Sequence, residues 1–93
     1  MFYIGIDIAK KAHEVCFLDA NGDVLDGNSF KIPNTASGVE KLQKMFDKYG
    51  LTPDNSVAGM EATGHYWMVL YSWITEKGFD VKVINPIVTD AYR

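Results

Sequence analysis

The sequence is poor in cysteine, in basic charge and in long apolar runs. Its single cysteine, Cys16, excludes an intrachain disulfide and a cysteine cluster for zinc. Nine basic residues against twelve acidic ones give a net charge of −3, whereas a free-standing nucleic-acid module needs a basic face. No apolar stretch approaches the ~20 residues of a transmembrane helix, and the N-terminus lacks the basic start of a signal peptide. We therefore expect a cytoplasmic protein with no membrane contact.

What the sequence does contain is enough apolar material for one packed domain. Hydrophobic residues make up 47% of the chain and aromatic residues 13%, which argues against disorder. A length of 93 residues predicts at most one small domain, over residues 1–93. Glycine-rich dinucleotide loops, Walker loops and the HExxH and CxxC metal motifs are all missing, which removes the commonest nucleotide and zinc signatures.

Three extended segments are expected first, over residues 2–8, 13–18 and 24–32, because each is rich in β-branched and aromatic residues. The third is loosened around residues 26–28. Between the second and third, Asn21-Gly22 favours a tight hairpin turn. Within 13–18, Val15 and Phe17 point to one face, and Cys16 is interpreted as a small core residue. These segments predict an antiparallel meander.

The pattern then changes to helical spacing. Thr35 or Ser37 is expected to cap a helix that carries an apolar stripe and stops at Gly50. A strand is predicted over 56–61 and a second helix from about residue 65 to 77, ended by Gly78. Because that helix is apolar almost all round, we expect it to be buried on more than one side. A last strand over 81–84 ends before Pro86.

The resulting order is βββαβαβ, an α/β fold with a mixed sheet. Right-handed crossovers would place the strand at 56–61 beside the first strand and parallel to it. This is the arrangement of the RNase H-like sheet, and also of the core of actin-like sugar kinases, so topology alone does not choose between them.

Two carboxylates end apolar strands of this expected sheet. Asp7 and Glu61 each follow a run of apolar residues, where a desolvated carboxylate without a partner would cost several kcal/mol. If the two strands are parallel neighbours, both groups emerge at one edge and can share a hard divalent cation. The plainer interpretation makes Asp7 a strand-end residue and Glu61 a helix cap; we favour the metal site.

Other polar residues allow a functional and a plain interpretation. Lys10 and Lys11 can contact a phosphate backbone, but hairpin lysines are usually only solvated. Thr63, Gly64 and His65 lie in a turn whose backbone N–H groups can bind phosphate, although a capping threonine and a turn glycine explain it equally well. His13, like His65, is expected to be an ordinary surface or capping residue.

Three motifs together carry a family resemblance. IGIDIAK at 4–10, GMEATG at 59–64 and VINP at 83–86, in this order and at about this spacing, resemble the DEDD-type insertion-sequence transposases, which are related to the Piv DNA invertase. The resemblance covers nearly the whole chain. It implies a RuvC-like RNase H fold in which four acidic residues hold two metal ions, Mg²⁺ or Mn²⁺, for cutting and joining DNA. DNA, for some members a guide RNA, and further copies of the protein are the implied partners.

The resemblance matches Asp7 to the first acidic residue of the family and Glu61 to the second. The remaining pair should be two closely spaced aspartates on a later helix. Asp90 has Arg93 where the second would stand, so that pair is not assigned here. The chain therefore looks truncated before the last helix of the fold, and we expect it to be inactive in isolation.

Two other functions stay open at this point. In an actin-like kinase for a sugar or acid, the segment 5–9 would begin a phosphate-binding hairpin, but Ile8, Ala9 and Lys10 stand where glycine and a hydroxyl residue are usual. A non-catalytic RNase H-like interaction module is the other possibility, since the apolar second helix with Trp67 and Trp73 would suit a partner surface.

Overall fold

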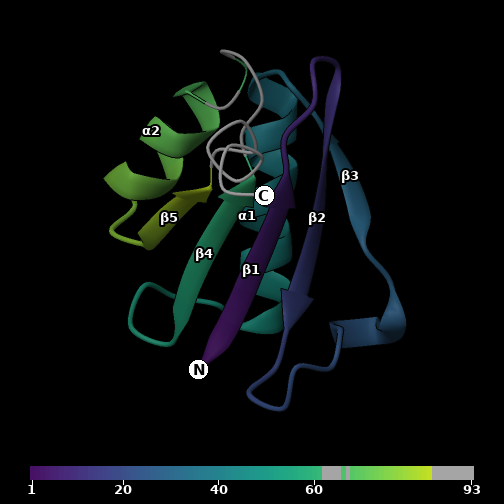
Figure 1. Ribbon diagram of the computed structural model, residues 1–93, viewed down its shortest axis with the longest axis vertical. Coiled ribbons are helices and arrows are strands. Elements are labelled where there is room, and N and C mark those ends of the chain that lie inside the picture. The colour runs from purple at the N-terminus through teal and green to yellow at the C-terminus, as the bar shows by residue number, and fades with distance from the viewer. Residues whose placement is uncertain (62–65, 67, 85–93) are drawn as a thin grey trace, which may run out of the picture.

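A single five-stranded sheet organises the chain (Figure 1). The computed structural model describes residues 1–61, 66 and 68–84. Its elements are β1 (Phe2–Asp7), β2 (Ala12–Leu18), η1 (Leu25–Gly27), β3 (Phe30–Pro33), α1 (Ala36–Tyr49), β4 (Ser56–Glu61), α2 (Met68–Glu76) and β5 (Asp80–Ile84). The strand order is β3-β2-β1-β4-β5. β2 runs antiparallel to β1 and β3, whereas β1, β4 and β5 are parallel. The predicted mixed sheet, with β4 beside β1, is confirmed.

The third predicted strand is shorter than expected. Val24 makes only an isolated bridge with Leu18, and β3 begins at Phe30. Between them the chain forms η1, where Asp26 has φ 59° and Gly27 has φ 70°. Left-handed residues in succession cannot continue a strand ladder, so the predicted strand is absent over 25–29.

Helix α1 begins and ends where the sequence predicted, but not by the expected side-chain cap. Thr35 occupies the N-cap position without a capping hydrogen bond from its side chain, and its hydroxyl pairs with that of Ser37 instead. The helix starts against the end of β3, since a Cβ on Gly38 would lie 1.8 Å from the carbonyl oxygen of Pro33. At the other end, Gly50 adopts φ 71° and donates its N–H to the carbonyl of Phe46, as the predicted glycine stop requires.

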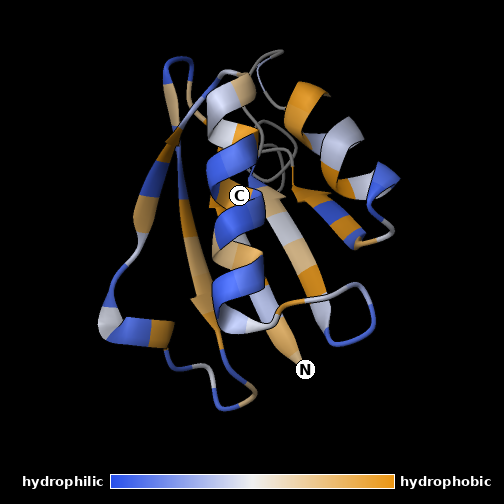
Figure 2. Ribbon diagram, turned by 180° about the vertical axis from the view of Figure 1, so that it is seen from behind, coloured by the Kyte–Doolittle hydropathy of each residue, from blue (hydrophilic) through white to orange (hydrophobic). Residues whose placement is uncertain are grey.

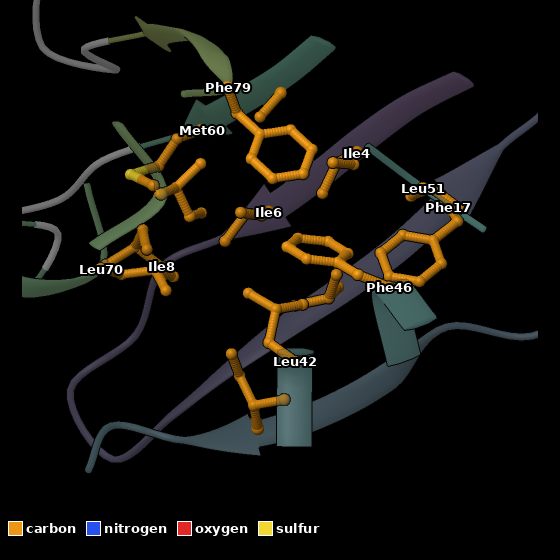
Figure 3. Close-up of a cluster of buried hydrophobic side chains, with 14 residues drawn as sticks. Ile4, Ile6, Ile8, Phe17, Leu42, Phe46, Leu51, Met60, Leu70 and Phe79 are labelled. Carbon is orange, nitrogen blue, oxygen red and sulfur yellow. The ribbon is translucent and has the colours of Figure 1, made fainter. Parts of the chain in front are cut away.

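Both helices pack on one face of the sheet and enclose the core. The buried cluster joins alternate residues of the strands to α1 and α2 (Figure 3). The rings of Phe46 on α1 and Trp73 on α2 stack with centroids 6.2 Å apart, so the helices also contact each other. Figure 2 shows α1 in front of the sheet with its hydrophilic side outward. None of the described helices is long and apolar enough to cross a membrane.

Helix α2 is buried on one side only, which corrects the expectation from its composition. Leu70 and Ile74 are its buried residues, whereas Met68 is 54% exposed and Val69 is 72% exposed. The helix lies near the edge strand β5 (Figure 1), so part of its apolar circumference has nothing to pack on among the described residues.

The opposite face of the sheet is left open by the part of the chain that the structure describes. Strand side chains alternate between faces: Ile4, Ile6, Ala58 and Met60 are buried beneath the helices, so the residues between them point to the other side. We call this second side the open face. It carries the candidate site.

Candidate metal site on the open face of the sheet

Asp7 and Glu61 lie side by side on the open face. β1 and β4 are parallel, and Asp7 is in register with Glu61 at the C-terminal end of both strands. The N–H of Ile8 donates to the carbonyl of Glu61 at 3.2 Å, which holds the pairing one residue further. The expected neighbourhood of the two carboxylates is therefore present. Both are exposed, so the expected desolvation cost is absent: the sheet turns them towards solvent, away from the core.

A third carboxylate, which sequence reasoning missed, extends this row. Asp7 also pairs with Glu14 of β2 across the antiparallel ladder, so acids flank it on both sides. Like charges directly opposite each other on a sheet destabilise it. Among the described residues no lysine or arginine forms an ion pair with any of the three. A bound cation would offset this repulsion.

The hairpin itself contained the signal for Glu14. In the β1–β2 pairing the residue numbers of each pair sum to 21, as for Ile4 with Phe17 and Asp7 with Glu14. A turn centred on Lys10 and Lys11 gives this sum directly. The predicted meander thus already implied that Asp7 faces Glu14.

The three carboxylates do not converge on one point. Within residues 1–61, 66 and 68–84, no group of three or more His, Cys, Asp or Glu side chains is close enough to hold a metal ion. Two adjacent carboxylates fit a hard divalent cation that takes oxygen ligands and keeps part of its water. They supply part of a coordination shell.

A hollow lies beside the carboxylates because two glycines are paired there. Gly5 is in register with Gly59. On each strand the glycine lies two residues before the carboxylate and therefore on the same face of the sheet. With no side chains at this pair, a depression of about 370 Å³ opens between the carboxylates and the middle of the sheet. Cys16 lines it and is half-buried, so the interpretation of Cys16 as a core residue was wrong: it shares the open face with Glu14.

Below this hollow the open face becomes more apolar. A neighbouring depression of about 360 Å³ shares both glycines and is lined further along by Tyr3, Val57 and Lys82. Tyr3 is 46% exposed. The open face thus offers a continuous surface that begins at three acids and ends at an aromatic ring and one lysine.

His13 caps the turn that follows Asp7, as one of its predicted roles required, but the prediction of a surface position was wrong. The side chain is only 1% exposed. Its Nδ1 accepts the N–H of Ala9 at 3.2 Å, so Nε2 carries the hydrogen and donates to Oδ1 of Asn34, 3.1 Å away. Asn34 in turn donates its side-chain amide to the carbonyl of Lys10 at 3.2 Å. His13 lies on the same face of β2 as Val15 and Phe17, and the alternation of side chains along the strand could have revealed its burial.

The residues proposed to contact nucleic acid are only partly described. Lys10 and Lys11 are exposed in the β1–β2 turn, directly beyond Asp7, a position open to a phosphate. Thr63, Gly64 and His65 lie outside the described residues, as do Asn85, Pro86 and Asp90.

The fold defines the class of protein first. A five-stranded mixed sheet in the order 3-2-1-4-5, with carboxylates at the ends of its two central parallel strands, is an RNase H-like α/β domain. Among solved structures the chain is similar to YeaZ from Pseudomonas aeruginosa, with TM-score 0.56, 10% identity, and 91% of this chain and 45% of that one covered. An exopolyphosphatase from Cytophaga hutchinsonii gives TM-score 0.50 and 14% identity, over 91% of this chain and 34% of that one. At such identities the likeness is one of fold alone.

The family follows from sequence comparison. A DEDD-type family profile described as "Transposase" matches residues 4–93. The pilin gene-inverting proteins of Moraxella lacunata and Moraxella bovis are each 30% identical to the chain over 90 residues, which is 97% of this chain and 27% of either relative. The chain belongs to the DEDD-type insertion-sequence transposase family. It spans about a quarter of the length of these curated relatives.

Proposed function

We propose that the chain is the N-terminal part of the catalytic domain of a DNA transposase or recombinase. In this proposal Asp7 and Glu61 supply two of the four acidic ligands of a two-metal centre that cuts and joins DNA strands. The supporting observation is their in-register pairing at the ends of β1 and β4 on the open face, in a chain that belongs to a transposase family. That membership favours this function over an actin-like kinase.

The donor set suits Mg²⁺ or Mn²⁺. Both ions prefer carboxylate oxygen and water to nitrogen or sulfur, and the acidic row on the open face is exposed and without an ion-pair partner among the described residues. When bound, two such ions activate the attacking oxygen and stabilise the leaving one in phosphoryl transfer. Asp7 and Glu61 would hold the ions, and the open face would stay accessible to a DNA strand.

Lys10 and Lys11 are proposed to contact the DNA phosphates next to the metal site, and the same role is proposed for Thr63, Gly64 and His65, which follow Glu61 in the sequence. The net charge is −3 with these two lysines included, so we propose that most of the phosphate contacts come from other parts of a longer protein. A guide RNA and further copies of the chain are proposed as additional partners, and the cytoplasm is the proposed location.

The experiment that tests this function is metal-dependent cleavage of supercoiled DNA. It compares the isolated chain with a longer protein that joins it to a downstream region of the relatives' length. We expect Mg²⁺-dependent cleavage by the longer protein only, reduced to background by Asp7→Asn and by Glu61→Gln. Glu40→Gln on α1 removes one negative charge elsewhere and should leave cleavage unchanged. Cleavage that persists in Asp7→Asn, or none by the longer wild-type protein, contradicts the proposal.

A further inference from the structure

We propose that Glu14 is a positioning residue of the metal site, holding water that is bound to the cation between Asp7 and Glu61. The proposal rests on the proposed function, because it presupposes a cation at those two carboxylates. It adds a carboxylate from β2, the strand on the far side of Asp7, to a site otherwise built on β1 and β4.

The register places Glu14 as close to Asp7 as Glu61 is. Paired residues of antiparallel strands have Cα atoms about 4.5–5.5 Å apart, and neighbouring strands of any kind lie about 4.8 Å apart. Glu14 faces Asp7 on one side and Glu61 faces it on the other. All three line the same depression, so Glu14 faces the space that the cation and its water would fill.

The Glu14 carboxylate is oriented, but it is not neutralised. Its Oε1 accepts the hydroxyl of Ser29 at 2.8 Å. Lys31 is its in-register neighbour on β3, where an ion pair would be the ordinary outcome, yet no ion pair of Glu14 occurs among the described residues. The hydrogen bond from Ser29 is made to one oxygen, and Oε2 has no hydrogen-bond partner among the described residues.

The contribution is through water because direct ligation by all three acids does not fit. No three acidic side chains of the described residues come close enough together to bind one ion. Divalent cations such as Mg²⁺ keep several waters, and these are donors for a nearby carboxylate. Partners of this outer kind commonly change metal affinity by about 10–100-fold when removed.

Mn²⁺ titration of the 93-residue chain, followed by amide NMR and calorimetry, separates the effect of the Glu14 charge from that of the hydrogen bond between Ser29 and Glu14. Glu14→Gln keeps an oxygen that can accept the Ser29 hydroxyl but removes the charge. Ser29→Ala keeps the Glu14 charge but removes the hydrogen bond that orients it. We expect Glu14→Gln to weaken Mn²⁺ binding by about 10–100-fold without lowering the melting temperature, because it removes a like charge opposite Asp7, and Ser29→Ala to weaken binding less. Glu40→Gln, the charge-matched control on α1, should bind Mn²⁺ like the wild type.

The outcomes distinguish this inference from the function on which it rests. If Asp7→Asn abolishes Mn²⁺ binding and Glu14→Gln leaves it at the wild-type value, the role of Glu14 is wrong and the metal site stands. If Glu14→Gln and Ser29→Ala both lower the melting temperature and leave the Mn²⁺ affinity unchanged, Glu14 is a purely structural residue. Mn²⁺ binding that is absent in the wild type or survives Asp7→Asn overturns the metal site and this inference together.

Discussion

Gly5 and Gly59 shape the surface beside the carboxylates, although the two glycines have different surroundings. A Cβ added to Gly59 would meet no heavy atom within 4 Å, whereas one added to Gly5 would lie 3.1 Å from Sγ of Cys16. Neither has the positive φ that would itself demand glycine. The hollow therefore exists because the side chains are missing, and the backbone would accept alanine at both positions.

This difference predicts that alanine will affect stability unequally at the two positions. Gly59→Ala should raise the free energy of unfolding by about 0.5–1 kcal/mol, because a strand alanine loses less backbone entropy than glycine. Gly5→Ala should be less stable than Gly59→Ala, because the sulfur of Cys16 must move aside. Urea unfolding measures both.

Cys16→Ala provides the control for this pair. In that background the close contact is gone, so Gly5→Ala should gain as much stability as Gly59→Ala. Equal stabilities of the two glycine variants in the wild-type background would show that the packing between β1 and β2 on the open face is looser than described.

Single residues also show how far sequence reasoning reached. Asp7 and Glu61 could be found because a carboxylate ending an apolar strand is conspicuous in the sequence. Glu14 and His13 were missed because finding them takes two inferences. The first is which residues of the hairpin pair with each other, and the second is which residues share a face of the sheet. His13 was judged by residue type, whereas its burial is set by lying on the same face as Val15 and by its hydrogen bonds to Ala9 and Asn34.

At the scale of elements, periodicity predicted where the helices lie but not how much of each is covered. α1 has a clear stripe, and its buried residues Leu42 and Phe46 fall on it. α2 is apolar nearly all round, so its sequence does not say which side packs. That choice depends on the sheet edge and on contact with α1 through Trp73. Likewise, the strand pattern over 24–28 did not reveal the left-handed backbone at Asp26.

The one-sided burial of α2 can be tested by a matched pair of substitutions. Val69→Lys should change the free energy of unfolding by no more than about 0.5 kcal/mol, because this side chain is largely exposed. Ile74→Ala should cost about 2–5 kcal/mol, because Ile74 is fully buried and leaves a cavity. Chemical unfolding at two protein concentrations is the measurement.

A large loss of stability in Val69→Lys at both concentrations would show that α2 is covered on its second side. A loss only at high concentration would instead assign that side to contact between copies of the chain, as expected of an interaction module.

At the scale of the whole molecule, the strand order followed from handedness. Two right-handed crossovers after a meander leave few arrangements, and β4 lies beside β1 as that rule requires. Function could not follow in the same way, because this sheet serves unrelated proteins. It was the spacing of three short motifs that indicated a family, and the family match over residues 4–93 confirms it. The proposed centre requires two further acidic ligands that have no assignment in this sequence, so it could not be predicted completely.

The proposed function requires a cation shared by Asp7 and Glu61. Paramagnetic broadening of the amide NMR signals by Mn²⁺ tests this directly in the wild type, in Asp7→Asn and in Glu61→Gln, with Glu40→Gln as the control of equal charge. We predict broadening centred on the ends of β1 and β4 in the wild type and the control, and its loss in both site variants. Broadening that is not localised there, or that persists when either carboxylate is removed, would contradict the metal site and with it the proposed function.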